Sequence, residues 1–151
     1  MIPYGRQDIN QADIDAVVEV LQSDFLTQGP KVPLFEELVA KKVGAKYSYA
    51  VNSATSALHV ACLALDLGEC DYLWTSPITF VASANCGLYC GADIDFVDID
   101  AKTHNICTAA LEAKLLQAQI DNKLPKVLVV VHMSGQSADM PAIKSLSERF
   151  G

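Results

Sequence analysis

Residues 51–59 (VNSATSALH) join a β-rich run to an apolar helix through small, hydroxylated side chains. The first backbone N–H groups of a helix have no intrahelical partner and carry about half a positive charge, so small side chains at that point let an anion approach. A phosphate group would therefore bind well at this turn, which covers residues 52–56. Serine and threonine at a helix start also serve as ordinary N-caps, and the residues alone leave both interpretations open.

Two later segments are expected to end at the same edge of the fold. In WTSPITFVASAN, Pro77 ends a strand and Phe80 begins a helix, where a ring could lie flat on a planar heteroaromatic ligand. A core position is the commoner explanation for a single phenylalanine. In HMSGQSADMPAI, His132 ends a strand, Gly135 permits a turn and Asp139 begins a helix, so His132 either binds a ligand or satisfies loop backbone.

The elements that position these segments follow from the periodicity of apolar residues. Residues 1–46 are expected to form an N-terminal helical arm, with Asn10 as an N-cap, Pro33 in the first turn of the second helix and Gly44 past its end. From residue 47 on, β-rich and helical runs alternate, which predicts strands at 47–52, 71–76, 92–100 and 126–133 and helices at 11–22, 33–44, 55–66, 80–91, 108–122 and 140–150.

This alternation predicts an α/β fold with three layers, a mostly parallel sheet with helices on both faces. The continuous apolar run VLVVV within residues 126–133 predicts that this strand is the most buried one. Ligands of such sheets bind at the carboxyl ends of the strands. The three segments together therefore predict a site for a phosphorylated planar cofactor, with pyridoxal 5'-phosphate as the obvious candidate.

The composition excludes several other classes of function. The net charge is −7 and the 11 lysines and arginines are dispersed, which disfavours a nucleic-acid partner. Neither GxGxxG nor GxxxxGK[ST] occurs, which disfavours a dehydrogenase or a kinase. The N-terminus MIPYGRQDIN has no apolar signal segment and no run spans a membrane, so we expect a soluble, cytoplasmic protein.

The five cysteines are odd in number and lack a CxxC spacing, which is typical of reduced thiols, mostly buried, in a cytosolic protein. Cys86 and Cys90 share a helix face at i, i+4 spacing, but no third ligand lies nearby in the sequence. We therefore expect no metal site.

Nearly the whole chain resembles the sugar-nucleotide aminotransferases of the DegT/DnrJ/EryC1/StrS type, a branch of the aspartate aminotransferase superfamily. The segments that carry the resemblance are IPYGRQDI, LTQGPKVPLFEELVAKKVGAKYSYAVNSATSALHVACLAL, WTSPITFVASANCGLYCGADIDFVDID and LPKVLVVVHMSGQSADMPAIKSLSERFG. Within this family, the motifs are most similar to those of the transaminases of pseudaminic acid biosynthesis. Those enzymes aminate C4 of a UDP-linked 4-keto-6-deoxy-N-acetyl hexosamine with glutamate as donor. The resemblance implies fold type I, pyridoxal 5'-phosphate and a homodimer with sites at the subunit interface.

The resemblance also implies roles for individual residues. Ala54, Thr55 and Ser56 match the family's phosphate-binding turn, Phe80 matches the aromatic residue that stacks on the pyridine ring, and Thr27 falls where relatives approach the sugar substrate. The family's Schiff-base lysine and the carboxylate that pairs with the pyridine nitrogen both belong after Gly151. No residue of this chain is therefore assigned a catalytic role.

We accordingly expect residues 47–151 to be the first part of a cofactor-binding large domain, inactive by itself. A first alternative keeps the fold but changes the chemistry to sugar dehydration, in which relatives have a histidine in place of the lysine. A second alternative is a non-catalytic, flavodoxin-like binding domain, which the length and the acidic charge would suit. It predicts a stable monomer that ignores the cofactor.

Overall fold

The computed structural model describes residues 5–151 and divides into two compact units, one ending at Ala50 and the other comprising Val51–Gly151. The sequence predicted a division after residue 46. Each unit has its own internal packing and is described separately.

The first unit holds two helices, α1 (Gln11–Leu21) and α2 (Lys31–Val43). Asn10 caps α1 as predicted, because its Oδ1 accepts from the N–H of Ala12 at 2.8 Å, while Asp13 accepts from the N–H of Asn10 at 2.9 Å. Pro33 lies in the first turn of α2, and Gly44 ends that helix with φ +69°, both as predicted. Neither helix buries a side chain among the described residues, so their apolar faces are open.

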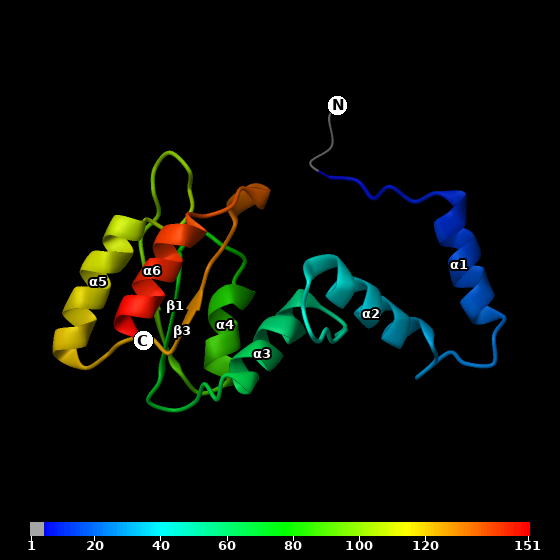
Figure 1. The fold of residues 1–151 in the computed structure, drawn as a ribbon, viewed down its shortest axis with the longest axis horizontal. Coiled ribbons are helices and arrows are strands. Elements are labelled where there is room, and N and C mark those ends of the chain that lie inside the picture. The colour runs from blue at the N-terminus through cyan, green and yellow to red at the C-terminus, as the bar shows by residue number, and fades with distance from the viewer. Residues whose placement is uncertain (1–4) are drawn as a thin grey trace. The chain divides into compact units, whose positions relative to one another are not determined.

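The second unit is built on a three-stranded, all-parallel sheet with the order β2-β1-β3. Its elements are α3 (Ala54–Ala64), β1 (Tyr72–Thr75), α4 (Ala82–Tyr89), β2 (Asp93–Phe96), α5 (Thr108–Asp121), β3 (Val127–Val129), a 3-10 turn (Met133–Gly135) and α6 (Met140–Phe150). Helices α3 and α4 cover one face of the sheet, and α5 and α6 cover the other (Figure 1). The predicted three-layer α/β fold is confirmed.

Each face of the sheet has its own core, and consecutive residues of β1 serve opposite faces. Leu73 is fully buried with Cys62 and Cys86 of α3 and α4. Trp74 is buried on the other side with a cluster that includes Leu111 of α5. The ammonium of Lys114 lies 4.8 Å from the centre of the Trp74 ring. Because both clusters depend on β1, the central strand holds the two helical layers together.

Two sequence-based predictions about strands are wrong. Residues 47–52 form no strand, because no neighbouring strand among the described residues pairs with them; the N–H of Ala50 donates to the Glu36 carboxylate instead, at 2.8 Å. The β3 run is only half-buried, whereas three of the four residues of β1 are fully buried. The reason is position, because β1 is central and β3 lies at an edge of this sheet.

Gly87 marks the closest approach of α4 to the sheet. A Cβ at this position would lie 2.5 Å from Ile94 Cδ1 and 3.1 Å from Leu73 Cβ. We expect Gly87→Ala to lower the free energy of unfolding by about 1–2 kcal/mol, because overpacking outweighs the gain in helix propensity. Urea denaturation followed by circular dichroism measures the change.

A matched double substitution tests the cause. Ile94→Val deletes the Cδ1 atom that a new Cβ would strike, so Gly87→Ala should cost less in that background than in the wild type. Equal costs in the two backgrounds would show that the close contact with Ile94 is not what requires glycine.

Candidate functional site

The carboxyl ends of β1 and β3 lie side by side, and the chain leaves them in opposite directions. After β1 it enters α4 on one face of the sheet, and after β3 it enters α6 on the other. Such a reversal is where open α/β sheets bind ligands, because the two departing loops leave a crevice between them. The N-terminus of α3 points to the same edge of the sheet, since α3 precedes β1 and runs back along it.

The start of α3 is a place where backbone donors are available. Ser53 caps the helix by accepting from the N–H of Ser56 at 3.2 Å. Among residues 5–151, no group accepts from the N–H groups of Ala54 and Thr55. No acidic residue lies in the first turn of α3 to neutralise the positive end of the helix. An anion would thus find two free amides and an uncompensated dipole.

The hydroxyls of Ser53 and Ser56 are already engaged with one another, whereas the Thr55 hydroxyl has no hydrogen-bond partner among residues 5–151. Ser56 Oγ donates to Asn52 Oδ1 at 2.7 Å and lies 3.1 Å from Ser53 Oγ. A hydroxyl has one proton, so Ser56 would have to release Asn52 before it could donate to a phosphate. The free amides of Ala54 and Thr55 and the Thr55 hydroxyl are therefore the donors available to an anion. Ser53 caps the helix while the N–H groups of Ala54 and Thr55 stay free, so the two interpretations of residues 51–59 are compatible.

Phe80 is not a core residue. Its side chain is 74% exposed, between the end of β1 and the start of α4, so the commoner explanation for a phenylalanine does not apply. Helices α3 and α4 pack side by side (Figure 1) and both begin at the carboxyl edge of the sheet. An exposed ring and a free helix N-terminus at one edge fit the two ends of a phosphorylated aromatic molecule.

His132 uses its ring within the loop that follows β3. Its Nδ1 accepts from the N–H of Ala138 at 3.0 Å. Gly135 adopts φ +83° and Asp139 caps α6 by accepting from Ala142 at 3.1 Å, both as predicted. The imidazole is exposed, and its Nε2 makes no hydrogen bond to any residue that the structure describes.

Asn105 ties the loop after β3 to the segment after β2, and sequence reasoning missed it. The residue is 3% exposed, and its side chain bonds only to the segment that follows β3. An asparagine in a polar turn, THNIC, resembles any other turn residue. The adjacent isoleucine was the only local sign, because Ile106 is buried and draws its neighbour inward.

Thr27 lies in an exposed bend of the first unit. A hollow of about 230 Å³ is found between the end of α1 and the start of α2, but Thr27 does not line it. Thr27 thus belongs to a different unit from Ala54, Thr55, Ser56 and Phe80, and its suggested approach to a substrate stays a prediction.

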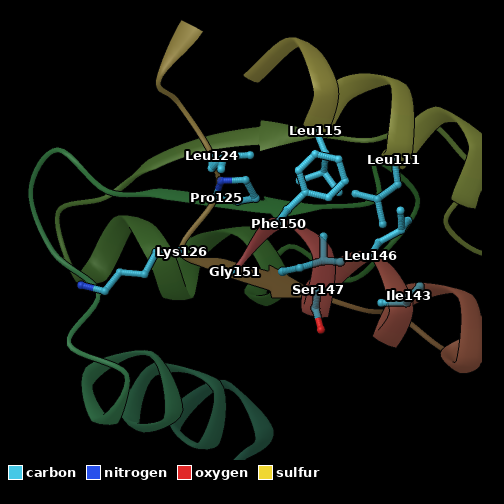
Figure 2. A pocket seen from close by; sticks show the side chains of 11 residues that line it. Leu111, Leu115, Leu124, Pro125, Lys126, Ile143, Leu146, Ser147, Phe150 and Gly151 are labelled. Atoms are coloured by element: carbon cyan, nitrogen blue, oxygen red, sulfur yellow. The ribbon is translucent and has the colours of Figure 1, made fainter. Parts of the chain in front are cut away.

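A small pocket of the second unit is mainly apolar, and none of these residues lines it. Figure 2 shows it between α5, α6 and β3, with Leu115 and Phe150 projecting into it. Its volume is about 120 Å³, and no residue proposed for the cofactor lines it. It suits packing rather than binding of a phosphorylated ligand.

The cysteine and lysine side chains have mainly structural roles. Burial, followed by a hydrogen bond with Cys86, raises the pKa of the Cys62 thiol to about 12, which leaves it protonated and unreactive at neutral pH. Cys70 departs from the expectation of buried thiols, because it is exposed in a turn. The lysines predicted to lie at the surface are exposed: Lys41, Lys42, Lys46, Lys102 and Lys144.

Comparison with known proteins finds related sequences that match almost the whole of this chain. The UDP-4-amino-4,6-dideoxy-N-acetyl-beta-L-altrosamine transaminase of Campylobacter jejuni is 41% identical over 150 residues, covering 99% of this chain and 39% of that protein. The spore coat polysaccharide biosynthesis protein SpsC of Bacillus subtilis is also 41% identical, with 99% of this chain and 37% of that protein covered. The chain thus spans about two fifths of the length of these curated relatives.

Solved structures of aminotransferases also match this chain. Helicobacter pylori PseC, an aminotransferase involved in the biosynthesis of pseudoaminic acid, matches with a TM-score of 0.87 and 33% identity over 98% of this chain and 38% of that one. The putative sugar aminotransferase Spr1654 of Streptococcus pneumoniae, in its PLP-form, matches with a TM-score of 0.85 and 27% identity over 98% and 36%.

No helix of residues 5–151 has the length and apolar character needed to cross a membrane. The model of the DegT/DnrJ/EryC1/StrS aminotransferase family matches residues 7–151, a relation that a flavodoxin-like binding domain would not have. The chain belongs to the DegT/DnrJ/EryC1/StrS aminotransferase family.

Proposed function

We propose that this chain is part of a pyridoxal 5'-phosphate-dependent aminotransferase that aminates a nucleotide-linked keto sugar. Within it, the N–H groups of Ala54 and Thr55 and the Thr55 hydroxyl hold the cofactor phosphate, Ser56 Oγ joins them once it releases Asn52, and Phe80 stacks on the pyridine ring. The observation that carries the proposal is the open N-terminus of α3, with two free amides and no acidic residue in its first turn. Thr27 is proposed to approach the sugar.

The finer assignment of substrate follows the relatives. Two of them act as UDP-4-amino-4,6-dideoxy-N-acetyl-beta-L-altrosamine transaminases by name. We extend this to a UDP-linked 4-keto-6-deoxy-N-acetyl hexosamine as substrate and glutamate as amino donor. A cytoplasmic location is part of the same proposal, and the five free cysteines support it.

The cofactor and this chain have different roles in the proposed reaction. The bound cofactor supplies the electron sink for amino transfer. The residues of this chain bind and orient it: the amides at the start of α3 fix the phosphate, and the Phe80 ring fixes the plane of the heterocycle. No proton transfer is assigned to any residue of this chain.

A homodimer is also proposed, because the outer surface of the α3 and α4 layer has no charge. Neither helix contains a charged side chain, yet several of their apolar residues are exposed: Val60, Leu63, Leu88 and Tyr89. A group of exposed apolar side chains without interspersed charges is typical of a surface that another protein covers. A second copy of the chain would cover this surface next to the cofactor edge, and sedimentation velocity would detect the dimer.

The test of cofactor binding uses pyridoxine 5'-phosphate, which has the ring and the phosphate but no aldehyde to react with exposed lysines. The probe is titrated into ¹⁵N-labelled protein and followed by NMR. We expect the amide signals of Ala54, Thr55 and Ser56 to shift most. Shifts confined to other parts of the chain would contradict the proposed phosphate-binding site.

Substituting Phe80 separates the two halves of the ligand. Phe80→Ala should weaken the binding of pyridoxine 5'-phosphate by about fivefold, because a stacked ring contributes about 1 kcal/mol to the binding free energy. Inorganic phosphate should bind equally well to both proteins, since it makes no ring contact. Phe80→Tyr is the control and should retain binding of both probes. Equal weakening of the two probes by Phe80→Ala would instead indicate a distorted turn.

A further inference from the structure

The loop between β3 and α6 is held by a single buried side chain from outside it. Asn105 Nδ2 donates to the carbonyl oxygens of Gln136 at 3.2 Å and Ser137 at 3.3 Å, and its Oδ1 accepts from the N–H of Met133 at 2.8 Å. Two carbonyl acceptors and one N–H donor fix which way the amide group points. All three hydrogen bonds reach the segment from Met133 to Ser137, so Asn105 acts on that segment as a unit.

The held segment cannot keep its shape by backbone preference alone. Ser134 adopts φ +53° and Gly135 follows with φ +83°. A left-handed conformation is unfavourable for a residue with a side chain, and it persists where surrounding contacts impose it. The hydrogen bond from Met133 to Asn105 secures the start of this strained turn, and those from Asn105 to Gln136 and Ser137 secure its end.

The segment closes on the imidazole of His132. The N–H of Ala138, the residue after Ser137, donates to His132 Nδ1 at 3.0 Å. Because Nδ1 acts as an acceptor there, the proton of the neutral ring is on Nε2. His132 is exposed three residues after β3, whose last residue, Val129, pairs with Thr75 at the end of β1. Its Nε2–H is thus an oriented donor at the ligand edge.

We propose that Asn105 is a positioning residue that fixes the tautomer and orientation of His132, and that His132 Nε2–H donates to an oxygen atom of the phosphorylated aromatic ligand. The second half of this inference rests on the proposed function. The first half depends only on contacts within the second unit. Neither residue needs to change its protonation state for the arrangement to work.

The positioning role is tested by NMR of the ¹⁵N-labelled chain. In the wild type, we expect His132 in the Nε2–H form and a scalar coupling across the hydrogen bond from the Ala138 amide to Nδ1. In Asn105→Ala, the coupling should disappear, both tautomers should be present, and amide exchange at Met133 and Ala138 should accelerate about tenfold, the effect of losing one hydrogen bond. Asn122→Ala is the matched control, since Asn122 lies at the end of α5 and its side chain makes no hydrogen bond to the loop among residues 5–151.

The binding role is tested by adding pyridoxine 5'-phosphate to the same samples. In the wild type, the signals of Ala54, Thr55, Ser56 and the His132 ring should all move. In Asn105→Ala, the signals of Ala54, Thr55 and Ser56 should still move, while those of the His132 ring should change little. Binding should be about fivefold weaker.

The outcomes separate this inference from the proposed function. Absence of the coupling in the wild type, or an unchanged His132 tautomer in Asn105→Ala, overturns the positioning role. Movement of the α3 signals without movement of His132 overturns its role in binding. If neither moves, the proposed function fails with the binding role, while the coupling still decides the positioning role. Should Asn105→Ala not fold, the wild-type coupling and the wild-type titration decide both questions.

Discussion

Ala54→Asp is expected to weaken binding of pyridoxine 5'-phosphate at least about thirtyfold while making the protein slightly more stable. Ala54 is the first residue of α3, is exposed, and has a free N–H. Two unit charges about 4 Å apart interact by about 1 kcal/mol even in water. A carboxylate beside a doubly charged phosphate therefore costs about 2 kcal/mol, which weakens binding at least about thirtyfold.

The opposite change in stability makes this substitution informative. A negative charge in the first turn of a helix stabilises it by about 0.3–1 kcal/mol, so lost binding cannot be attributed to unfolding. The measurements are an NMR titration and a urea denaturation curve. Ala54→Asn is the control, because it has nearly the same shape without the charge and should retain most of the affinity. Unimpaired binding by Ala54→Asp would mean that the phosphate is held elsewhere.

Leu73→Ala is expected to lower the free energy of unfolding by about 2–5 kcal/mol, the range for a fully buried leucine whose removal leaves a cavity. Leu73 is 0% exposed, lies on the central strand and packs against Cys62 and Cys86 from the α3 and α4 layer. Urea denaturation followed by circular dichroism at the helix band measures the change.

The matched substitution is Leu65→Ala at the end of α3, where the side chain is 57% exposed. Its expected cost is about 0.5 kcal/mol or less, as for other surface positions. If the two substitutions cost the same, the core described around β1 does not stabilise this unit. Because the layer that Leu73 supports also carries the start of α3, its loss should weaken ligand binding as well.

How far the sequence predicts this fold depends on how local each determinant is. Residues 140–150 were predicted as a helix, and α6 has those bounds, because its cap by Asp139 and its apolar period lie within the segment itself. Residues 47–52 were predicted as a strand and form none. Their β propensity is real, but a strand exists only with a partner, and the partner is not written in the segment.

The same distinction explains the site. The open start of α3 was predictable, because the donors at a helix N-terminus follow from the helix itself. The exposure of Phe80 was not, since the same residue type usually packs inside. Asn105 was missed because its partners are 28 to 32 residues away in the sequence. Only the parallel order β2-β1-β3 brings the segment after β2 against the segment after β3.

The position of Trp74 has a practical consequence for spectroscopy. It is the sole tryptophan of the chain, and its ring faces the α5 and α6 layer under the Lys114 ammonium. Its emission spectrum should therefore report on that layer and remain almost constant if the opposite layer of α3 and α4 loosens first. A red shift that lags behind the loss of ellipticity on heating would reveal that the two halves of this small sandwich melt in sequence.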